Sequence, residues 1–253
     1  MIMPVIFVGH GNPMNAVSDS PFSAAWAELG HRLPAPSAIL SVSAHWETDG
    51  TRVTTMERPR TIHDFYGFPE ELYRVQYPAP GSRDLAERVR RLVPEVMEDA
   101  GWGLDHGTWA VLCRMYPAAD VPVVQLSLNR RLSPAAHVSL ARRLAPLRDE
   151  GVLIVGSGNI VHNLGVMQWG EAKPYPWAEE FDRLSAELIL AGDLDVLCDY
   201  QNLGEAARLS IPTNEHYLPL LYALALRRPD DAVAFFAEEI VLASVSMRGV
   251  RIG

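Results

Sequence analysis

The sequence predicts an α/β domain in which helices cover both faces of a β-sheet. Short apolar runs bounded by turn residues alternate with longer segments of helical period along the 253 residues. Two of these runs are almost continuously apolar, VPVVQLSL and GVLIVGSG, which is typical of strands buried on both faces. Because no internal repeat, low-complexity tract or linker rich in Gly or Ser interrupts the pattern, we expect residues 1–253 to form a single domain.

The strands are predicted from runs that are rich in branched apolar residues and end at Gly, Pro, Asp or Ser. The predicted ranges are 5–8, 38–43, 52–56, 121–127 and 152–156. Strand-like alternation of apolar and polar residues returns at the carboxyl end, over 232–237 and 244–252.

The helices are predicted from capping residues and from apolar residues spaced three or four apart. A helix is expected over 83–93, because Ser82 is a favourable N-cap and Leu85, Val89 and Leu92 share one face. Similar signals predict three further helices, over 135–147, 178–190 and 217–226.

The segment 57–80 fits neither a strand nor a helix. It holds four prolines and several aromatic residues, and it is too apolar for a flexible linker. Long ordered loops of this kind usually carry function, so we expect it to contribute to a binding site.

Charge and cysteine content exclude several classes of protein. Lys plus Arg number 22 and Asp plus Glu 31, a net charge of −9, which argues against a dedicated nucleic-acid binder. Only Cys113 and Cys198 are present, so neither a disulfide framework nor a cysteine-rich zinc site is expected. No apolar run approaches the roughly 20 residues that span a bilayer, and the amino end lacks the basic leader of a signal peptide. These features predict a cytoplasmic protein with no membrane or nucleic-acid partner.

Three histidines follow predicted strands. His10 lies in GHGNP, His45 in SAHW and His162 in GSGNIVHN. In an open α/β sheet the carboxyl ends of the strands line the ligand crevice. A single histidine in a loop is most often an ordinary hydrogen-bonded residue, but three at such ends are expected to converge on one site.

Two more histidines could join this site. His216 lies in PTNEHYLP at the start of an apolar helix, and His106 lies in DHGTW between two glycines. Without a usable cysteine pair, the chain offers a metal only nitrogen and oxygen ligands, which suits Fe(II) or Zn(II) with open coordination positions. His31 and His137 are expected to be ordinary helix residues.

His63 lies in the loop sequence TIHDFYGFP. Asp64 could orient an imidazole there, and Phe65, Tyr66 and Phe68 could form the wall of a pocket for an aromatic substrate. The alternative is that these residues form an aromatic loop folded over the core, or an interface between copies of the chain in a homo-oligomer.

The GSGN sequence has two weaker interpretations. It could form a phosphate-binding turn, but it lacks the lysine and the spacing of a P-loop and the spacing of a dinucleotide fingerprint. Ser157 within it remains an alternative candidate as a nucleophile, although no Gly-x-Ser-x-Gly elbow surrounds it.

The motifs taken in order carry a specific resemblance. They run from Val8 to Tyr222 as GHGNPMN, VSAHW, TIHDFYGFP, YPAPGS, DHGTW, VPVVQLS, GSGNIVHNL, PYPWA and NEHYLPLLY, with SMRGVRIG at the end of the chain. In this set the chain resembles the class III extradiol ring-cleavage dioxygenases, and within them the group of 4,5-DOPA extradiol dioxygenases.

The resemblance implies a single catalytic α/β domain with a mixed central β-sheet flanked by helices and a metal site at the carboxyl ends of the strands. It implies one non-haem divalent metal held by His10, His45 and His216, with Fe(II) needed for activity and Zn(II) expected in recombinant protein. His162 would be the acid/base beside a catechol substrate, and His106 would position the substrate or O₂. A catechol that binds through both oxygens needs three protein ligands on one side of the metal and open positions on the other.

Several alternatives remain open at this point. Glu215 stands next to His216 and is the other candidate for the third ligand, since the wider class often uses a glutamate there. The same histidines would also serve a zinc-dependent hydrolase, and a binding module without turnover could share the fold. The sequence does not distinguish DOPA from a related catecholic acid or a simple diol.

Overall fold

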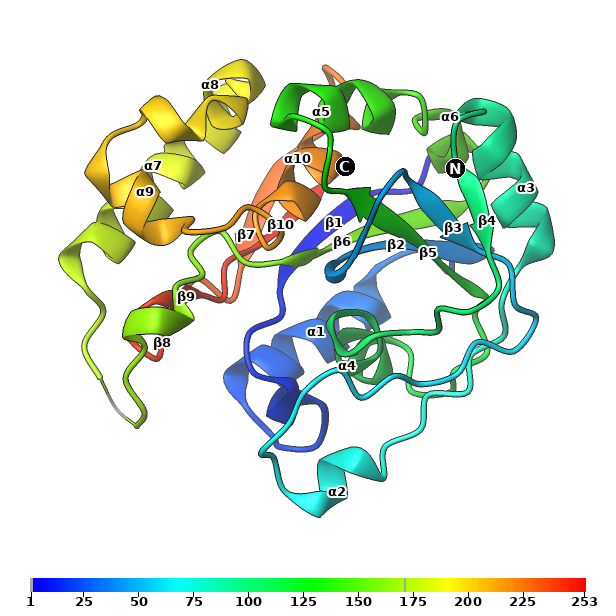
Figure 1. The fold of residues 1–253 in the computed structure, drawn as a ribbon, viewed down its shortest axis with the longest axis horizontal. Coiled ribbons are helices and arrows are strands. Elements are labelled where there is room, and N and C mark those ends of the chain that lie inside the picture. The colour runs from blue at the N-terminus through cyan, green and yellow to red at the C-terminus, as the bar shows by residue number, and fades with distance from the viewer. Residues whose placement is uncertain (1, 171) are drawn as a thin grey trace.

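The computed structural model describes residues 2–170 and 172–253, and a mixed β-sheet forms its centre (Figure 1). The strands are β1 Val5–Gly9, β2 Ala38–Thr48, β3 Arg52–Thr54, β4 Met97–Asp99, β5 Val123–Asn129, β6 Val152–Gly158, β7 Val233–Phe236, β8 Ile240–Val241, β9 Val245–Ser246 and β10 Gly249–Ile252. In the described residues the main sheet has the order β4-β3-β5-β2-β6-β1-β10-β7, and β8 pairs with β9 separately. The predicted single α/β domain with a mixed sheet is confirmed.

The middle of the sheet is parallel and its edges are mixed. β6 pairs in parallel with both β1 and β2, and β2 pairs in parallel with β5. β10 runs antiparallel to β1 and to β7, and β3 runs antiparallel to β5. The carboxyl ends of β1, β2 and β6 therefore lie at one edge of the sheet, where a ligand crevice is expected in an open α/β fold.

Helices cover both faces of the sheet (Figure 1). They are α1 Pro21–Arg32, α2 Glu70–Tyr73, α3 Arg83–Leu92, α4 His106–Met115, α5 Pro134–Arg142, α6 Pro146–Asp149, α7 Pro176–Ala191, α8 Leu194–Cys198, α9 Glu205–Ser210 and α10 Leu218–Ala225, with short 3₁₀ turns η1 Pro13–Ala16, η2 Leu164–Val166 and η3 Tyr200–Asn202. α1 and α4 lie on one face, whereas α3, α5 and α10 lie on the other.

The alternation of side chains in β1 divides the core into two layers. Val5 and Phe7 pack with the α3, α5 and α10 side, and Ile6 and Val8 pack with the α1 and α4 side. All four are completely buried, and each such side chain stabilises the fold by about 1.5–3 kcal/mol. A strand that is apolar at every position is what a sheet covered on both faces requires.

The helix predicted over 135–147 is interrupted. α5 ends at Arg142, and a separate turn, α6, starts at Pro146. Proline has no backbone N–H to donate and its ring clashes with the preceding helical turn, so Pro146 can open a helix but cannot continue one.

Two long helices gave no clear signal in the sequence. α4 is buried on nearly every side, so its apolar residues show no helical period. α1 begins with a reciprocal capping box between Ser20 and Ser23, in which each side chain accepts from the other residue's backbone N–H. Serine at both positions is a weaker signature than the usual pairing with glutamate.

The described part of the chain contains no helix with the length and apolar character that a membrane crossing requires.

Cys113 and Cys198 are both free thiols. The absence of a disulfide framework agrees with the sequence prediction.

His137 is a structural residue in α5, as predicted from the sequence. It is completely buried, and its Nδ1 lies 3.0 Å from the Tyr222 hydroxyl in α10. Burial lowers the pKa of His137 from about 6.5 to about 4. The ring is therefore neutral in the folded protein at neutral pH.

We expect the substitution His137→Gln to reduce the pH dependence of the free energy of unfolding. The unfolded chain takes up a proton on this ring between pH 6.5 and pH 4 while the folded chain does not, so stability is lost as the pH falls through that range. Between pH 7 and pH 5 this group should account for a loss of about 2 kcal/mol in the wild type. Urea unfolding at the two pH values measures the difference, with the exposed His31→Gln as matched control. Equal losses in the wild type and the His137 variant would contradict the assignment.

Candidate metal centre and active-site cavity

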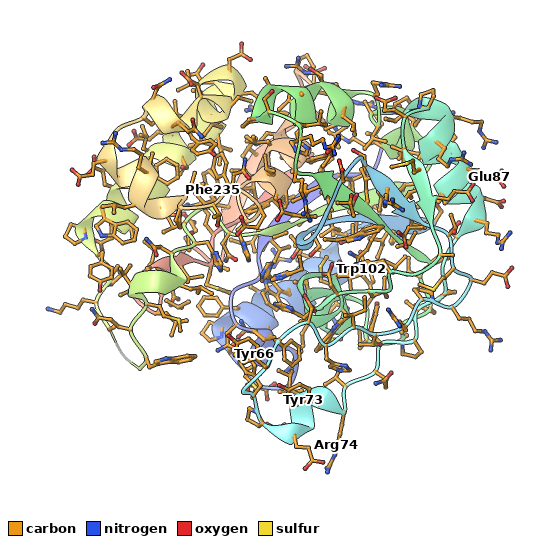
Figure 2. All side chains as sticks on the ribbon, viewed as in Figure 1. Tyr66, Tyr73, Arg74, Glu87, Trp102 and Phe235 are labelled. Carbon is orange, nitrogen blue, oxygen red and sulfur yellow. The ribbon has the colours of Figure 1, made fainter. Side chains whose placement is uncertain are left out.

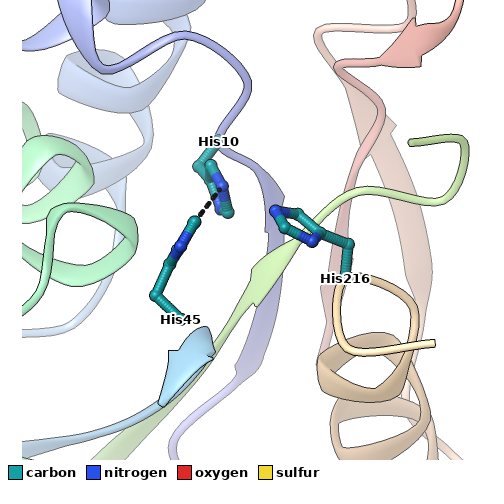
Figure 3. Close-up of side chains that lie close together, drawn as sticks. All are labelled: His10, His45 and His216. Atoms are coloured by element: carbon teal, nitrogen blue, oxygen red, sulfur yellow. Dashed lines mark hydrogen bonds between the residues drawn. The ribbon is translucent and has the colours of Figure 1, made fainter. Parts of the chain in front are cut away.

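Three histidines from different parts of the chain meet at the edge of the sheet (Figure 3). His10 follows β1, His45 lies in β2, and His216 lies just before α10. The ring centroid of His10 lies 4.9 Å from that of His45 and 5.2 Å from that of His216. The ring centroids of His45 and His216 are 5.1 Å apart. One nitrogen of each ring lies within 4.8 Å of the others, a spacing at which they could hold one metal ion.

Hydrogen bonds fix the tautomer of His10. Ser157 Oγ donates to the Gly107 carbonyl over 2.5 Å, so its proton is already used. The 3.0 Å contact between His10 Nδ1 and Ser157 Oγ must therefore be an N–H of the ring donating to the hydroxyl. This leaves a lone pair on His10 Nε2. Ser157 thus orients a histidine, and nothing in its surroundings supports the alternative role as a nucleophile.

His216 and His45 are oriented in the same way. His216 Nδ1 lies 3.1 Å from Glu215 Oε1, and His45 Nδ1 lies 3.4 Å from Asp64 Oδ2. Because a carboxylate only accepts hydrogen bonds, the contact with Glu215 leaves Nε2 as the unprotonated atom of His216. This arrangement favours Glu215 as the neighbour that orients His216 rather than as the third ligand.

The donor set fits a divalent metal ion. His10 Nε2 and His45 Nε2 are only 3.0 Å apart, and two lone pairs at that distance repel unless a proton or a cation lies between them. Metal–nitrogen bonds of about 2.0–2.1 Å bring neighbouring ligand atoms to this separation. Three imidazoles with no thiolate suit Fe(II) or Zn(II).

The electrostatics keep these rings neutral. Burial lowers the pKa of His10 and of His216 well below its ordinary value, and neighbouring histidines lower both further. Burial, followed by the charge of His106, lowers the pKa of His45 to about 3. A metal ion therefore meets ligands that need lose no proton at neutral pH.

His45 does not follow its strand, as the sequence suggested, but lies within it. β2 continues to Thr48, and its pairing with β5 shifts register between Val42 and Glu47. Such a bulge bends the strand and redirects side chains, and here it surrounds His45. The sequence showed the end of the apolar run and could not show that the strand continues beyond it.

A close backbone approach positions His216. A Cβ atom at Gly158 would lie 2.1 Å from the His216 carbonyl oxygen, and the next residue, Asn159, donates its N–H to that oxygen over 2.8 Å. Only glycine allows the end of β6 and the 216 loop to approach so closely.

Asp64 contacts two histidines of the site, His106 and His45, and His63 is not one of the two. Asp64 Oδ1 accepts a hydrogen bond from the His106 backbone N–H over 2.9 Å. Asp64 Oδ2 lies 3.0 Å from His106 Nδ1 and 3.4 Å from His45 Nδ1. The 3.0 Å contact between Asp64 Oδ2 and His106 Nδ1 is not an aligned hydrogen bond. Although burial opposes it, the contact with His106 lowers the pKa of Asp64 and keeps it ionised.

His162 and His106 lie on opposite sides of the metal-ligand candidates. The His162 ring stacks on His216 at 3.4 Å between centroids, and the His106 ring lies 3.9 Å from that of His45. Burial lowers the pKa of His162 to about 4, so the ring is a proton acceptor at neutral pH. His106 opens α4, where Asp105 caps the helix by accepting from Thr108.

All five histidines line one cavity of about 650 Å³, a size typical of small-molecule sites. Phe65 and Tyr66 of the 57–80 loop line it as well. His63 does not line it: its Nε2 lies 3.1 Å from the Val75 carbonyl oxygen, and its ring packs against Phe65 and Trp109. The structure therefore gives His63 a supporting position behind the aromatic wall instead of the substrate contact that the sequence suggested.

Several apolar lining residues were not predicted. They are Met14, Leu164, Met167, Trp169, Leu242 and Val245. Leu242 enters from the tight turn between β8 and β9, where Leu242 and Ala243 have φ values of 51° and 63° that non-glycine residues seldom adopt. These residues come from distant segments with no chemical motif of their own, so no local signal in the sequence could have identified them.

Comparisons with known proteins show which family this chain resembles. The family model described as the catalytic LigB subunit of aromatic ring-opening dioxygenase matches residues 5–249. A protein of Escherichia coli (strain K12) named 4,5-DOPA dioxygenase extradiol is 48% identical over 258 residues, covering 99% of this chain and 95% of that protein. One of the same name from Beta vulgaris is 40% identical over 232 residues, with 88% and 86% covered. A crystal structure of an Escherichia coli K12 protein superposes with a TM-score of 0.87 at 45% identity, covering 99% of this chain and 100% of that one.

We expect the substitution Gly158→Ala to weaken divalent-metal binding. The added methyl group must displace the backbone of His216, so Zn(II) affinity should fall at least about tenfold, as it does when groups that orient ligands are lost. Calorimetric titration of chelator-treated protein with Zn(II) measures this. The matched control is Gly101→Ala, where an added Cβ meets nothing closer than 3.5 Å. Unchanged affinity in a folded Gly158 variant would contradict the assigned constraint.

Proposed function

Because this chain belongs to the family of the catalytic LigB subunit of aromatic ring-opening dioxygenases and is an extradiol dioxygenase, we propose that it opens the ring of a catechol with O₂ at a non-haem metal centre. The metal ligands in this proposal are His10, His45 and His216. The observation that carries it is the convergence of these rings in the cavity wall, where one nitrogen of each lies within 4.8 Å of the others. Ser157 and Glu215 hold the Nδ1 atoms of His10 and His216. Relatives named for 4,5-DOPA make DOPA, or a related catecholic acid, the first substrate to test.

The donor set is consistent with iron as the active metal. Fe(II) bound there would coordinate both catechol oxygens and supply the redox chemistry with O₂, whereas Zn(II) would fill the same ligands without redox activity. The protein contributes three neutral ligands on one side and leaves the cavity side open for the small molecules.

His162 is proposed as the proton carrier. Its ring lies in the cavity wall, stacked on His216, and is neutral at pH 7 because burial lowers its pKa. It can accept the proton of a catechol hydroxyl at a ring nitrogen and return it when the ring-opened product forms. A group near the substrate is needed for this role because a catechol must lose protons to bind as a chelate.

His106 is proposed to position the substrate or O₂. Asp64 lies beside its Nδ1, and the ring lines the cavity. Phe65 and Tyr66 would then flank the aromatic ring of the substrate. Asp64 is a positioning residue in this scheme, because it acts through His106 and His45.

The alternatives of a zinc hydrolase and of a non-catalytic binding module have no observation of their own in their favour. The same histidines would serve both, but the family match over residues 5–249 favours ring opening.

The direct test is reconstitution of metal-free protein with Fe(II) under anaerobic conditions. Oxygen-electrode and visible-absorbance assays then follow with DOPA, protocatechuate, caffeate and catechol. We expect oxygen uptake with formation of a yellow ring-opened product, and none in protein reconstituted with Zn(II). Silence across the panel in protein that holds one equivalent of iron would overturn the proposal.

Single substitutions should separate metal binding from proton transfer. We expect His10→Ala, His45→Ala and His216→Ala to lose the metal, whereas His162→Ala keeps it and loses activity by about 10²–10⁴-fold, the usual effect of removing a general acid/base. Metal content by mass spectrometry and oxygen uptake are the two measurements, with the exposed His31→Gln as control. Full activity in the His162 variant would remove that residue from the mechanism.

A further inference from the structure

We propose that the cavity selects catechols whose ring substituent is cationic or uncharged and discriminates against those whose substituent carries a net negative charge. This inference rests on the proposed function and narrows its substrate class. It concerns the end of the cavity that receives the substituent, away from the histidines that would receive the diol.

A carboxylate would find no cationic partner in this cavity. Among the described residues that line the cavity there is no lysine or arginine. Besides the histidines, the titratable lining residues include an acid, Asp64. Asn12 supplies an amide, and most of the remaining lining is apolar. A buried carboxylate without a matching donor keeps most of its desolvation cost.

Two arginines of neighbouring segments are engaged in other contacts. Arg114, which contacts the η1 segment beside the cavity, donates to the carbonyl oxygens of Asn15 and Ser18 and pairs with Asp19. Arg130 donates to the Glu47 carbonyl oxygen in β2. Neither guanidinium lines the cavity.

The mouth of the cavity instead offers aromatic faces. Tyr66, labelled in Figure 2, is 92% exposed, and Trp169 is 69% exposed. Both line the cavity together with Phe65 and Phe68. Aromatic faces attract ammonium groups and accept apolar groups, and they repel carboxylates.

The wider electrostatic field acts in the same direction. Glu215 and Asp64 flank the histidine cluster from two sides, and the chain carries a net charge of −9. Such a field raises the local concentration of cations and lowers that of anions. Lining, mouth and field therefore all disfavour a substituent with a net negative charge. In DOPA the ammonium group offsets the charge of the carboxylate beside it, so the substituent carries no net charge.

The test compares three catechols of similar size: dopamine, 4-ethylcatechol and 3-(3,4-dihydroxyphenyl)propanoate. Their dissociation constants are measured by calorimetry with Zn(II)-loaded protein, in which no turnover interferes. Oxygen uptake is measured in parallel with Fe(II)-loaded protein. We expect dopamine and 4-ethylcatechol to bind at least about tenfold more tightly than the propanoate, and kcat/KM to follow the same order.

The possible outcomes separate the proposed charge selection from the proposed dioxygenase function. Equal or tighter binding of the propanoate, with oxygen uptake intact, would overturn the charge selection and leave the dioxygenase proposal standing. No binding of any of the three catechols together with no oxygen uptake would overturn both.

A substitution at the mouth gives the inference an independent check. Leu164 lines the cavity and is 51% exposed, so it tolerates a polar side chain. Leu164→Lys should shift the binding ratio of propanoate to dopamine toward the propanoate by about tenfold. The neutral Leu164→Gln is the matched control and should leave the ratio near that of the wild type. An unchanged ratio in the lysine variant would contradict the role of charge at this end of the cavity.

Discussion

The parallel pairing of β6 with both β1 and β2 is the constraint on which the site depends. It brings three strand ends to one edge of the sheet, so that His10, His45 and the turn after Gly158 become neighbours. The close contact of Gly158 with the His216 carbonyl then joins the segment before α10 to the same place. Because these contacts are made by backbone atoms within the core, the histidines are held by the most rigid part of the fold.

The second requirement is that several histidines be buried together in neutral form. Burial and mutual repulsion disfavour their charged forms. Ser157 and Glu215 each face one Nδ1 atom and keep His10 and His216 in one tautomer. Asp64 faces the Nδ1 atoms of both His45 and His106. The clustered histidines are therefore unfavourable for stability in the absence of a cation. A metal ion would relieve the repulsion between the facing Nε2 atoms of His10 and His45.

The cavity joins this rigid floor to walls of a different kind. The floor consists of strand ends and the start of α4, whereas the walls are loops and short turns at 64–69, 164–169 and 242–245. Chemistry is therefore placed on elements that the core fixes, and recognition of the substituent is placed on segments that can change without disturbing it. Phe65, Tyr66 and Trp169 in those walls carry no part of the chemistry proposed for the histidines.

The sequence by itself determined the α/β class, most strand positions, and the histidines that meet in the cavity, because apolar runs, glycines and histidines leave local signals. It did not determine that Pro146 ends a helix early, that β2 runs through His45, or that His63 lies behind the aromatic wall. It also could not match Asp64 with His106, or bring Leu164, Trp169 and Leu242 into one cavity. Those features depend on contacts between residues far apart in the chain, and only the packing of strands and loops in three dimensions decides them.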